Sequence, residues 1–126
     1  MSLNVNIGFN EKENFWLVKP RGEIDIYTSP EFNEKLVEAI NDKKADIVID
    51  GEELDYLDST GLGTLISIFK LLKEDGNKVY IKNIKPNIRK LFYITELDKV
   101  FMIEEWLIWA GIYLNWQFQQ NLIIFL

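Results

Sequence analysis

The sequence predicts an α/β fold, in which strands and helices alternate along the chain. From Leu3 to Phe9, apolar and polar side chains alternate with the period of two that is typical of a strand with one buried face. Further along, Phe32, Leu36, Val37 and Ile40 share one face of a helix, as expected for a helix that packs on a sheet. The order strand, helix, strand, helix, strand, helix indicates a layered structure with right-handed crossovers.

The first third of the chain contains two predicted strands. Residues 3–9 form an outer or edge strand, and the polar residues 10–14 form a turn. A second strand covers residues 15–26 with an interruption near Pro20, because proline has no N–H to give to a neighbouring strand. We therefore expect a bulge or a sheet edge at Pro20.

A helix start follows at Thr28-Ser29-Pro30-Glu31. Thr28 and Glu31 have the spacing of a capping box, and Pro30 suits the first helical position. After this helix, residues 46–50 form a short and nearly all-apolar run. Such a run is typical of a central strand that is covered on both faces.

The second half of the chain predicts two further helices and two further strands. A long helix follows Ser59 and ends at Asp75-Gly76-Asn77, a typical stop and turn. A strand at 79–81, a helix that starts at Pro86 and a last strand within 97–103 complete the pattern. The apolar positions that define the long helix are Leu62, Leu65, Ile66, Phe69 and Leu72.

The composition excludes several classes of function. The 126 residues, 48% of them hydrophobic, suffice for one domain with a single core. A net charge of −6 argues against nucleic acid as a partner, because nucleic-acid binding depends on clustered Lys and Arg. The absence of cysteine and histidine excludes disulfides, thiolate metal sites, histidine-based triads and most zinc sites. The N-terminus lacks the features of a secretion signal, so we expect a cytoplasmic protein.

The segment from Leu54 to Gly63 carries the strongest functional signal, because it places Ser59 where a strand ends and a helix begins. The first turn of a helix has unpaired N–H groups and a partial positive charge, so an anion such as phosphate is stabilised there. Ser59 is therefore the leading candidate site. Asp58 and Ser59 are also ordinary N-cap residues, and an isolated Asp-Ser-Thr-Gly sequence would mean no more than a helix start.

Two further segments favour a functional role for the Ser59 segment over an ordinary helix start. Arg21-Gly22-Glu23-Ile24-Asp25 precedes the Ser59 segment, and Ile94-Thr95-Glu96-Leu97-Asp98-Lys99-Val100-Phe101 follows it. Together the three segments resemble the STAS domain, and within it the anti-sigma factor antagonists, over roughly residues 3 to 104. The resemblance implies a STAS-type mixed β-sheet of about four to five strands with helices packed mainly on one side, formed by residues 1–105.

The resemblance also implies a regulatory switch and not an enzyme. In the family, an anti-sigma factor that is also a serine kinase phosphorylates the serine that corresponds to Ser59. The unmodified protein captures this anti-sigma factor and frees the sigma factor, and phosphorylation ends the capture. A metal-dependent serine phosphatase resets the switch. ATP or ADP and Mg²⁺ are expected on the partner kinase, and no cofactor is expected on this chain.

The residues around Ser59 are candidate partner contacts, each with a structural alternative. Asp25 contacts the partner or orders the turn at Thr28, and Asp58 contacts the kinase or caps the helix. Thr60 is a second hydroxyl whose ordinary role is structural. The remaining candidates are Gly61 and Gly63, which serve close packing or partner approach, and Leu62, which anchors a partner or fills the core.

Two other functions stay open from the sequence. An enzyme would use Ser59 as a nucleophile activated by a lysine such as Lys82 or Lys85, but nothing in the sequence places either lysine beside it. The stronger alternative is a STAS domain that is not phosphorylated and acts as a scaffold or as a sensor of small anions or nucleotides. Nucleotide binding by the isolated protein would favour the sensor.

The last segment, residues 106–126, departs from the family pattern of a charged amphipathic helix. It has no charged side chain and contains three of the four tryptophans. Its polar residues interrupt the roughly 20 apolar residues that a membrane span needs, so we expect no membrane insertion. Two interpretations remain: an arm that packs on the sheet or on a second subunit, which would give a homodimer, and a non-native end produced by a frame shift.

Overall fold

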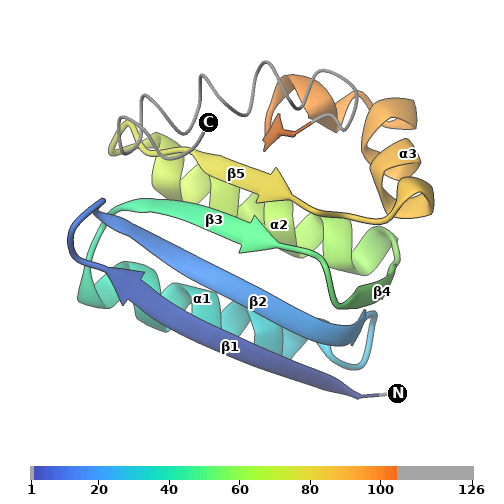
Figure 1. Cartoon of the computed structure of the whole chain (residues 1–126), viewed down its shortest axis with the longest axis horizontal. Coiled ribbons are helices and arrows are strands. Elements are labelled where there is room, and N and C mark those ends of the chain that lie inside the picture. The colour runs from blue at the N-terminus through green and yellow to red at the C-terminus, as the bar shows by residue number, and fades with distance from the viewer. Residues whose placement is uncertain (1, 105–126) are drawn as a thin grey trace.

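The computed structural model describes residues 2–104, and its first two strands form an antiparallel hairpin (Figure 1). Strand β1 (Leu3–Asn10) pairs along its whole length with β2 (Phe15–Ile24). At the turn, Asn14 has a φ of 61°, and its N–H donates to the Asn10 carbonyl at 2.7 Å. Asparagine tolerates this left-handed conformation better than most residues. β1 forms the edge of the described sheet, as the sequence predicts.

The sheet has six strands in the order β1-β2-β3-β5-β6, with β4 paired to β2. Only the β1–β2 pair is antiparallel, so the sheet is mixed, which confirms the predicted fold class. It has one strand more than the predicted four to five, because residues 54–57, which are not among the predicted strands, pair with the end of β2. The later strands are β3 (Asp46–Asp50), β4 (Leu54–Leu57), β5 (Val79–Lys82) and β6 (Met102–Ile103).

The expected interruption at Pro20 is wrong, because β2 continues through this residue. Beyond β1, β2 pairs with β3 over residues 15–18 and with β4 over residues 22–24. Pro20 falls between these two partners, so its missing N–H deprives neither ladder of a donor. The irregularity lies between Gly22 and Glu23, where Gly22 has a φ of 111° that favours glycine. The bulge is thus a property of the glycine and not of the proline.

Three helices connect the strands: α1 (Ser29–Asp42), α2 (Ser59–Lys73) and α3 (Pro86–Ile94). Helices α1 and α2 lie on the same face of the sheet (Figure 1), which confirms the expected one-sided packing. A 3₁₀ turn, Leu97–Lys99, leads from α3 towards β6. The predicted helix faces are correct in outline, although Ile68, absent from the predicted set, is fully buried while Ile66 and Phe69 are only partly buried.

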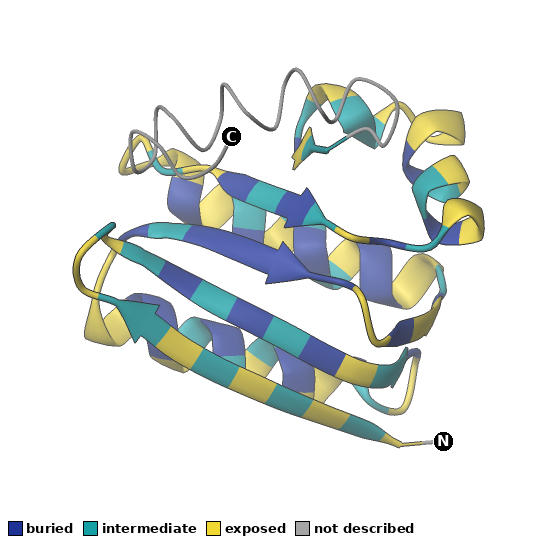
Figure 2. Cartoon of the chain, viewed as in Figure 1, coloured by how far each residue is buried: buried dark blue, intermediate teal, exposed yellow. Residues whose placement is uncertain are grey.

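The core lies between the sheet and the helices. β3 is buried along almost its whole length, whereas β1 alternates with exposed residues (Figure 2). Phe101 holds the later elements together, because its ring meets the rings of Phe69 and Phe92 edge to face at 5.9 and 5.7 Å. Such aromatic contacts add to the free energy gained by burial.

The parallel strands β2, β3, β4 and β5 end at the same edge of the sheet, towards the right of Figure 1. Ligands and partners of α/β proteins usually bind at this edge. β4 leaves the main order of strands and pairs with the last residues of β2. It thereby brings the start of α2 next to the loop that follows β2.

Within residues 2–104, no helix is long and apolar enough to cross a membrane. The predictions for residues 106–126, including the homodimer contact and the frame-shifted end, lie outside the described residues.

Candidate functional site

The start of α2 is built around Asp58. Its side chain caps the helix, with Oδ1 accepting a hydrogen bond from the Gly61 N–H at 3.0 Å. Its own N–H donates to the Ile24 carbonyl at the end of β2, at 3.2 Å. Asp58 therefore fixes the helix start to the neighbouring strand. Ser59 and Thr60, the first two residues of the helix, are exposed.

The loop after β2 is ordered by the carboxylate of Asp25, which is only 4% exposed. Oδ1 accepts hydrogen bonds from the N–H groups of Tyr27 at 2.9 Å and Thr28 at 3.0 Å. Burial acts to raise the pKa of this carboxyl, but these bonds and the Thr28 hydroxyl outweigh it, so the pKa is lowered from its ordinary value. Asp25 is therefore charged at neutral pH and holds the turn in place.

The Thr28 side chain does not form the predicted capping box with Glu31. Its hydroxyl donates to the Glu23 carbonyl at 2.8 Å and accepts from the Asp25 N–H at 2.9 Å, so it faces back towards the strand. α1 accordingly starts without a side-chain cap bond, and Pro30 is its second residue. The predicted capping box is therefore absent, because the Thr28 hydroxyl is already engaged with Glu23 and Asp25.

Asp25 and Ser29 each keep one buried oxygen without a hydrogen-bond partner in the described part of the chain, Oδ2 and Oγ respectively. The described residues contain no group of three or more side chains arranged to hold a metal ion.

The two glycines of the motif have different surroundings. A Cβ on Gly61 would lie 2.5 Å from Leu57 Cδ1 and 3.0 Å from the Ile24 carbonyl oxygen, so any larger residue would force Leu57 and the end of β2 to shift. A Cβ on Gly63 would have nothing within 4 Å, and Gly63 is exposed. Gly61 thus serves the packing of α2 on β2, whereas no contact within the described chain requires glycine at position 63.

The structure brings the predicted site residues together but divides them by exposure. Ser59, Thr60 and Gly63 are exposed and Asp58 is partly exposed. The buried members are Asp25, Gly61 and Leu62, with Leu62 in the hydrophobic core.

The structure adds two residues that sequence reasoning missed. Ile26 and Tyr27 follow Asp25 in the loop after β2 and are 60% and 80% exposed. Because Asp58 bonds to Ile24, this loop lies beside the helix start that carries Ser59. The sequence signal for them is a pair of apolar residues just before a helix start, but the predicted strand 15–26 includes Ile26, whereas β2 ends at Ile24. We call Ile26, Tyr27, Asp58, Ser59, Thr60 and Gly63 the docking surface.

The lysines considered for a catalytic role have other contacts or positions. Lys85 Nζ forms an ion pair with Asp55 Oδ1 at 2.7 Å and donates to the Leu54 carbonyl at 3.2 Å. Lys82 ends β5, which neighbours β3 and not β4. No contact in the described structure joins either ammonium group to Ser59.

The mixed sheet with helices on one face, and the exposed serine at a capped helix start beside the end of β2, are the features that the comparison with known families can be checked against. A profile of the STAS domain family matches residues 6–113, and the chain belongs to this family. Among its relatives, the anti-sigma-B factor antagonist of Staphylococcus aureus (strain NCTC 8325 / PS 47) is 36% identical over 103 residues, which cover 82% of this chain and 95% of that protein.

Solved structures agree with this assignment. The crystal structure of an anti-sigma factor antagonist from Mycobacterium paratuberculosis matches with a TM-score of 0.69 and 28% identity, covering 81% of this chain and 85% of that chain. The Bacillus cell fate determinant SpoIIAA in its phosphorylated form has the same fold, with a TM-score of 0.63 and 20% identity over 82% of this chain and 93% of that one.

Proposed function

We propose that this chain is an anti-sigma factor antagonist that is switched by phosphorylation of Ser59. Unphosphorylated, it binds an anti-sigma factor that is also a serine kinase, and the sigma factor is released. The kinase then transfers the γ-phosphoryl group of ATP to Ser59 Oγ, and the complex separates. The names of the relatives support antagonism, and the serine position supports the switch.

The exposure of Ser59 beside Ile26 and Tyr27 is the observation that carries this proposal. A kinase needs an accessible hydroxyl, and a tight complex needs apolar or aromatic side chains that become buried at the interface. The docking surface offers both within one edge of the sheet. Asp25 supports it from below by ordering the turn that carries Tyr27.

Phosphorylation would act on the interface more than on the fold. A phosphate adds between one and two negative charges at the start of α2, where the helix dipole stabilises an anion by about 0.3–1 kcal/mol. A partner fitted to a hydroxyl would meet this bulk and charge beside the Asp58 carboxylate. Like charges held together across an interface cost several kcal/mol. The isolated domain would therefore change little while the complex is lost.

The other parts of the switch belong to the partners. ATP and Mg²⁺ would bind the kinase, and a metal-dependent serine phosphatase would restore the hydroxyl. This chain would need neither cofactor nor catalytic group of its own, and it would act in the cytoplasm where sigma factors work.

Phosphopeptide mapping tests the proposed site. The native chain, Ser59→Ala and the control Thr60→Ala are incubated with host lysate and Mg-ATP, and their intact masses are measured. We expect one phosphate on the native chain and on Thr60→Ala, mapped to Ser59, and none on Ser59→Ala. An unmodified native chain, in a lysate that phosphorylates a known antagonist, would contradict the switch. Nucleotide binding by the isolated native chain would then point to the sensor alternative.

A further inference from the structure

The face of the sheet opposite α1 and α2 carries no helix within residues 2–104 (Figure 1), yet its central valine is buried. Val48 is 2% exposed. Its neighbours Ile47 and Ile49 belong to the core on the helix side, and side chains alternate along a strand, so Val48 points to the opposite face. Leu17 and Tyr80, its register partners on β2 and β5, are only partly buried.

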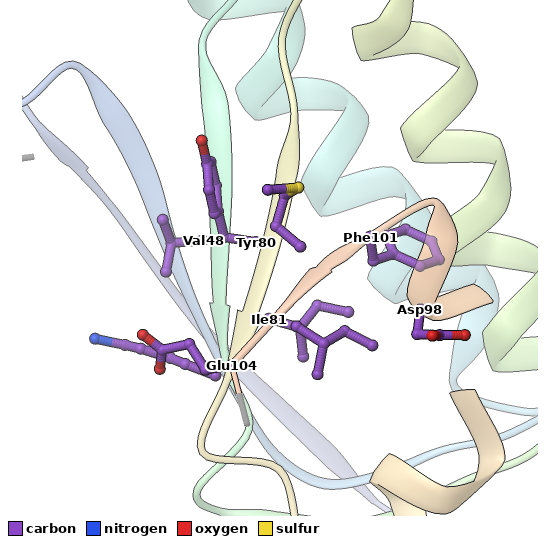
Figure 3. A pocket seen from close by; sticks show the side chains of 9 residues that line it. Val48, Tyr80, Ile81, Asp98, Phe101 and Glu104 are labelled. Carbon is purple, nitrogen blue, oxygen red and sulfur yellow. The ribbon is translucent and has the colours of Figure 1, made fainter. Parts of the chain in front are cut away.

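A cavity of about 300 Å³ opens beside Val48. Tyr80, Met102 and Ile103 contribute to its lining, and Figure 3 shows Val48 and Tyr80 among the side chains around it. Lys82, Asp98 and Glu104 supply its charged part. Burial, together with the Asp46 carboxylate, raises the pKa of the Tyr80 hydroxyl, as expected for a phenol sheltered from water on this face.

The described chain ends at this cavity. The Glu104 N–H donates to the Ile81 carbonyl at 3.0 Å, which extends the pairing of β6 with β5 and holds residue 104 against the sheet. The segment that follows, residues 106–126, has no charged side chain and contains Trp106, Trp109 and Trp116. Glu104, which lines this largely apolar cavity, is therefore only one residue away in the sequence from an uncharged segment rich in tryptophan.

We propose that residues 106–126 of the same chain pack on this open face of the sheet and place an apolar side chain in the cavity beside Val48. The segment itself has no charged side chain that would have to leave water, and its packing would cover apolar lining residues such as Met102, which is 47% exposed. Its attachment at residue 104 gives it a high effective concentration at the cavity compared with any separate partner.

The length of the segment suffices. Even at the rise of a helix, about 1.5 Å per residue, its 21 residues reach about 30 Å. Four neighbouring strands spaced by about 4.8 Å span less than 20 Å. The segment therefore reaches from β6 across β5 and β3 to β2.

Paramagnetic broadening in the full-length chain tests the proposal. The chain has no cysteine, so Lys19→Cys accepts a single nitroxide label. Lys19 shares the open face with Leu17, and its side chain is 43% exposed. Its ion pair with the buried Asp50 is long, at 4.0 Å, and the Asp50 carboxylate keeps its hydrogen bonds from the Glu52 N–H and the Asn83 side chain when Lys19 is replaced. The control label is placed at Glu38→Cys, an exposed residue of α1 that lines a different cavity together with Trp16.

The indole N–H signals of the four tryptophans give the result. We expect the Lys19→Cys label to remove most of the intensity of the Trp106, Trp109 and Trp116 signals, and the Glu38→Cys label to remove that of Trp16 instead. If the Lys19→Cys label leaves these three signals at full intensity, the proposal is overturned. So would broadening that arises only in mixtures of labelled and isotope-enriched chains, because the segment would then pack on a second copy.

Discussion

Ser59 and Asp25 follow neighbouring strands, and their exposure gives them different roles. Ser59 is exposed at the first position of α2, where a partner reaches its hydroxyl. Asp25 is buried, and its carboxylate serves the loop that presents Ile26 and Tyr27. The sequence could identify both residues through their motifs, but only the contacts of Asp25 show that it acts as an organiser.

The role of Asp25 predicts a pH-dependent contribution to stability. Its pKa is lower in the folded chain than in the unfolded one, so the carboxylate stabilises the fold at pH values above the unfolded pKa of about 3.9. This contribution is lost as the pH falls through the lowered folded pKa. We therefore expect Asp25→Asn to lower the free energy of unfolding at neutral pH, and its difference from the native chain to shrink in acid.

Urea unfolding of both chains between pH 7 and pH 3 measures this difference. Asp55→Asn is the control, because Asp55 pairs with Lys85 at an exposed position where ion pairs contribute little. A constant difference between native chain and Asp25→Asn over the whole range would show that the ionised carboxylate is not what holds the turn.

The exposed apolar residues of the docking surface should contribute to partner affinity without stabilising the fold. Ile26 is 60% exposed and Ile94, on α3 outside the docking surface, is 68% exposed, so the two form a matched pair. We expect Ile26→Ala to weaken binding of the anti-sigma partner by about 1–2 kcal/mol, roughly 5- to 30-fold in Kd, while Ile94→Ala leaves it unchanged. Calorimetric titration measures both values, and equal effects of the two changes would remove Ile26 from the interface.

The starts of α1 and α2 show when the local sequence is enough to predict how a helix is capped. The start of α2 follows the sequence because Asp58 finds its acceptor role within its own helix, at the Gly61 N–H. The start of α1 does not, because the Thr28 hydroxyl binds the Glu23 carbonyl on the preceding strand. A capping motif predicts a helix start, but a nearby unpaired carbonyl competes for the same hydroxyl.

The glycines of α2 give a prediction at this scale. Gly61→Ala places a methyl group against Leu57 and the backbone of Ile24, and we expect a loss of about 1–3 kcal/mol in unfolding free energy. Gly63→Ala has open space around it and should gain about 0.5–1 kcal/mol, the difference in helix propensity.

Thermal and urea unfolding compare these two variants with the native chain. If Gly63→Ala is stable but binds the anti-sigma partner more weakly, Gly63 belongs to the interface. A Gly61→Ala chain as stable as the native one would contradict the close packing of α2 on β2.

In the whole molecule, the sheet order and the docking surface depend on contacts that no local pattern contains. The alternation of residues 3–9 and the apolar run of 46–50 predict their strands correctly. The pairing of β4 with the end of β2 is tertiary, and together with the hydrogen bond from the Asp58 N–H to the Ile24 carbonyl it brings Ile26 and Tyr27 beside Ser59. The expected interruption at Pro20 is wrong for the same reason, because β2 tolerates a proline only where its missing N–H falls between β3 and β4.

The central claim is that phosphate on Ser59 ends partner binding while the domain stays folded. The most direct measurement is the Kd of the purified anti-sigma partner for the native chain, for the same chain phosphorylated at Ser59, and for Ser59→Ala treated with the kinase. We expect the phosphorylated chain to bind at least about 100-fold more weakly, and Ser59→Ala to bind like the unmodified chain before and after treatment. Equal affinity of the phosphorylated and unmodified chains would contradict the account.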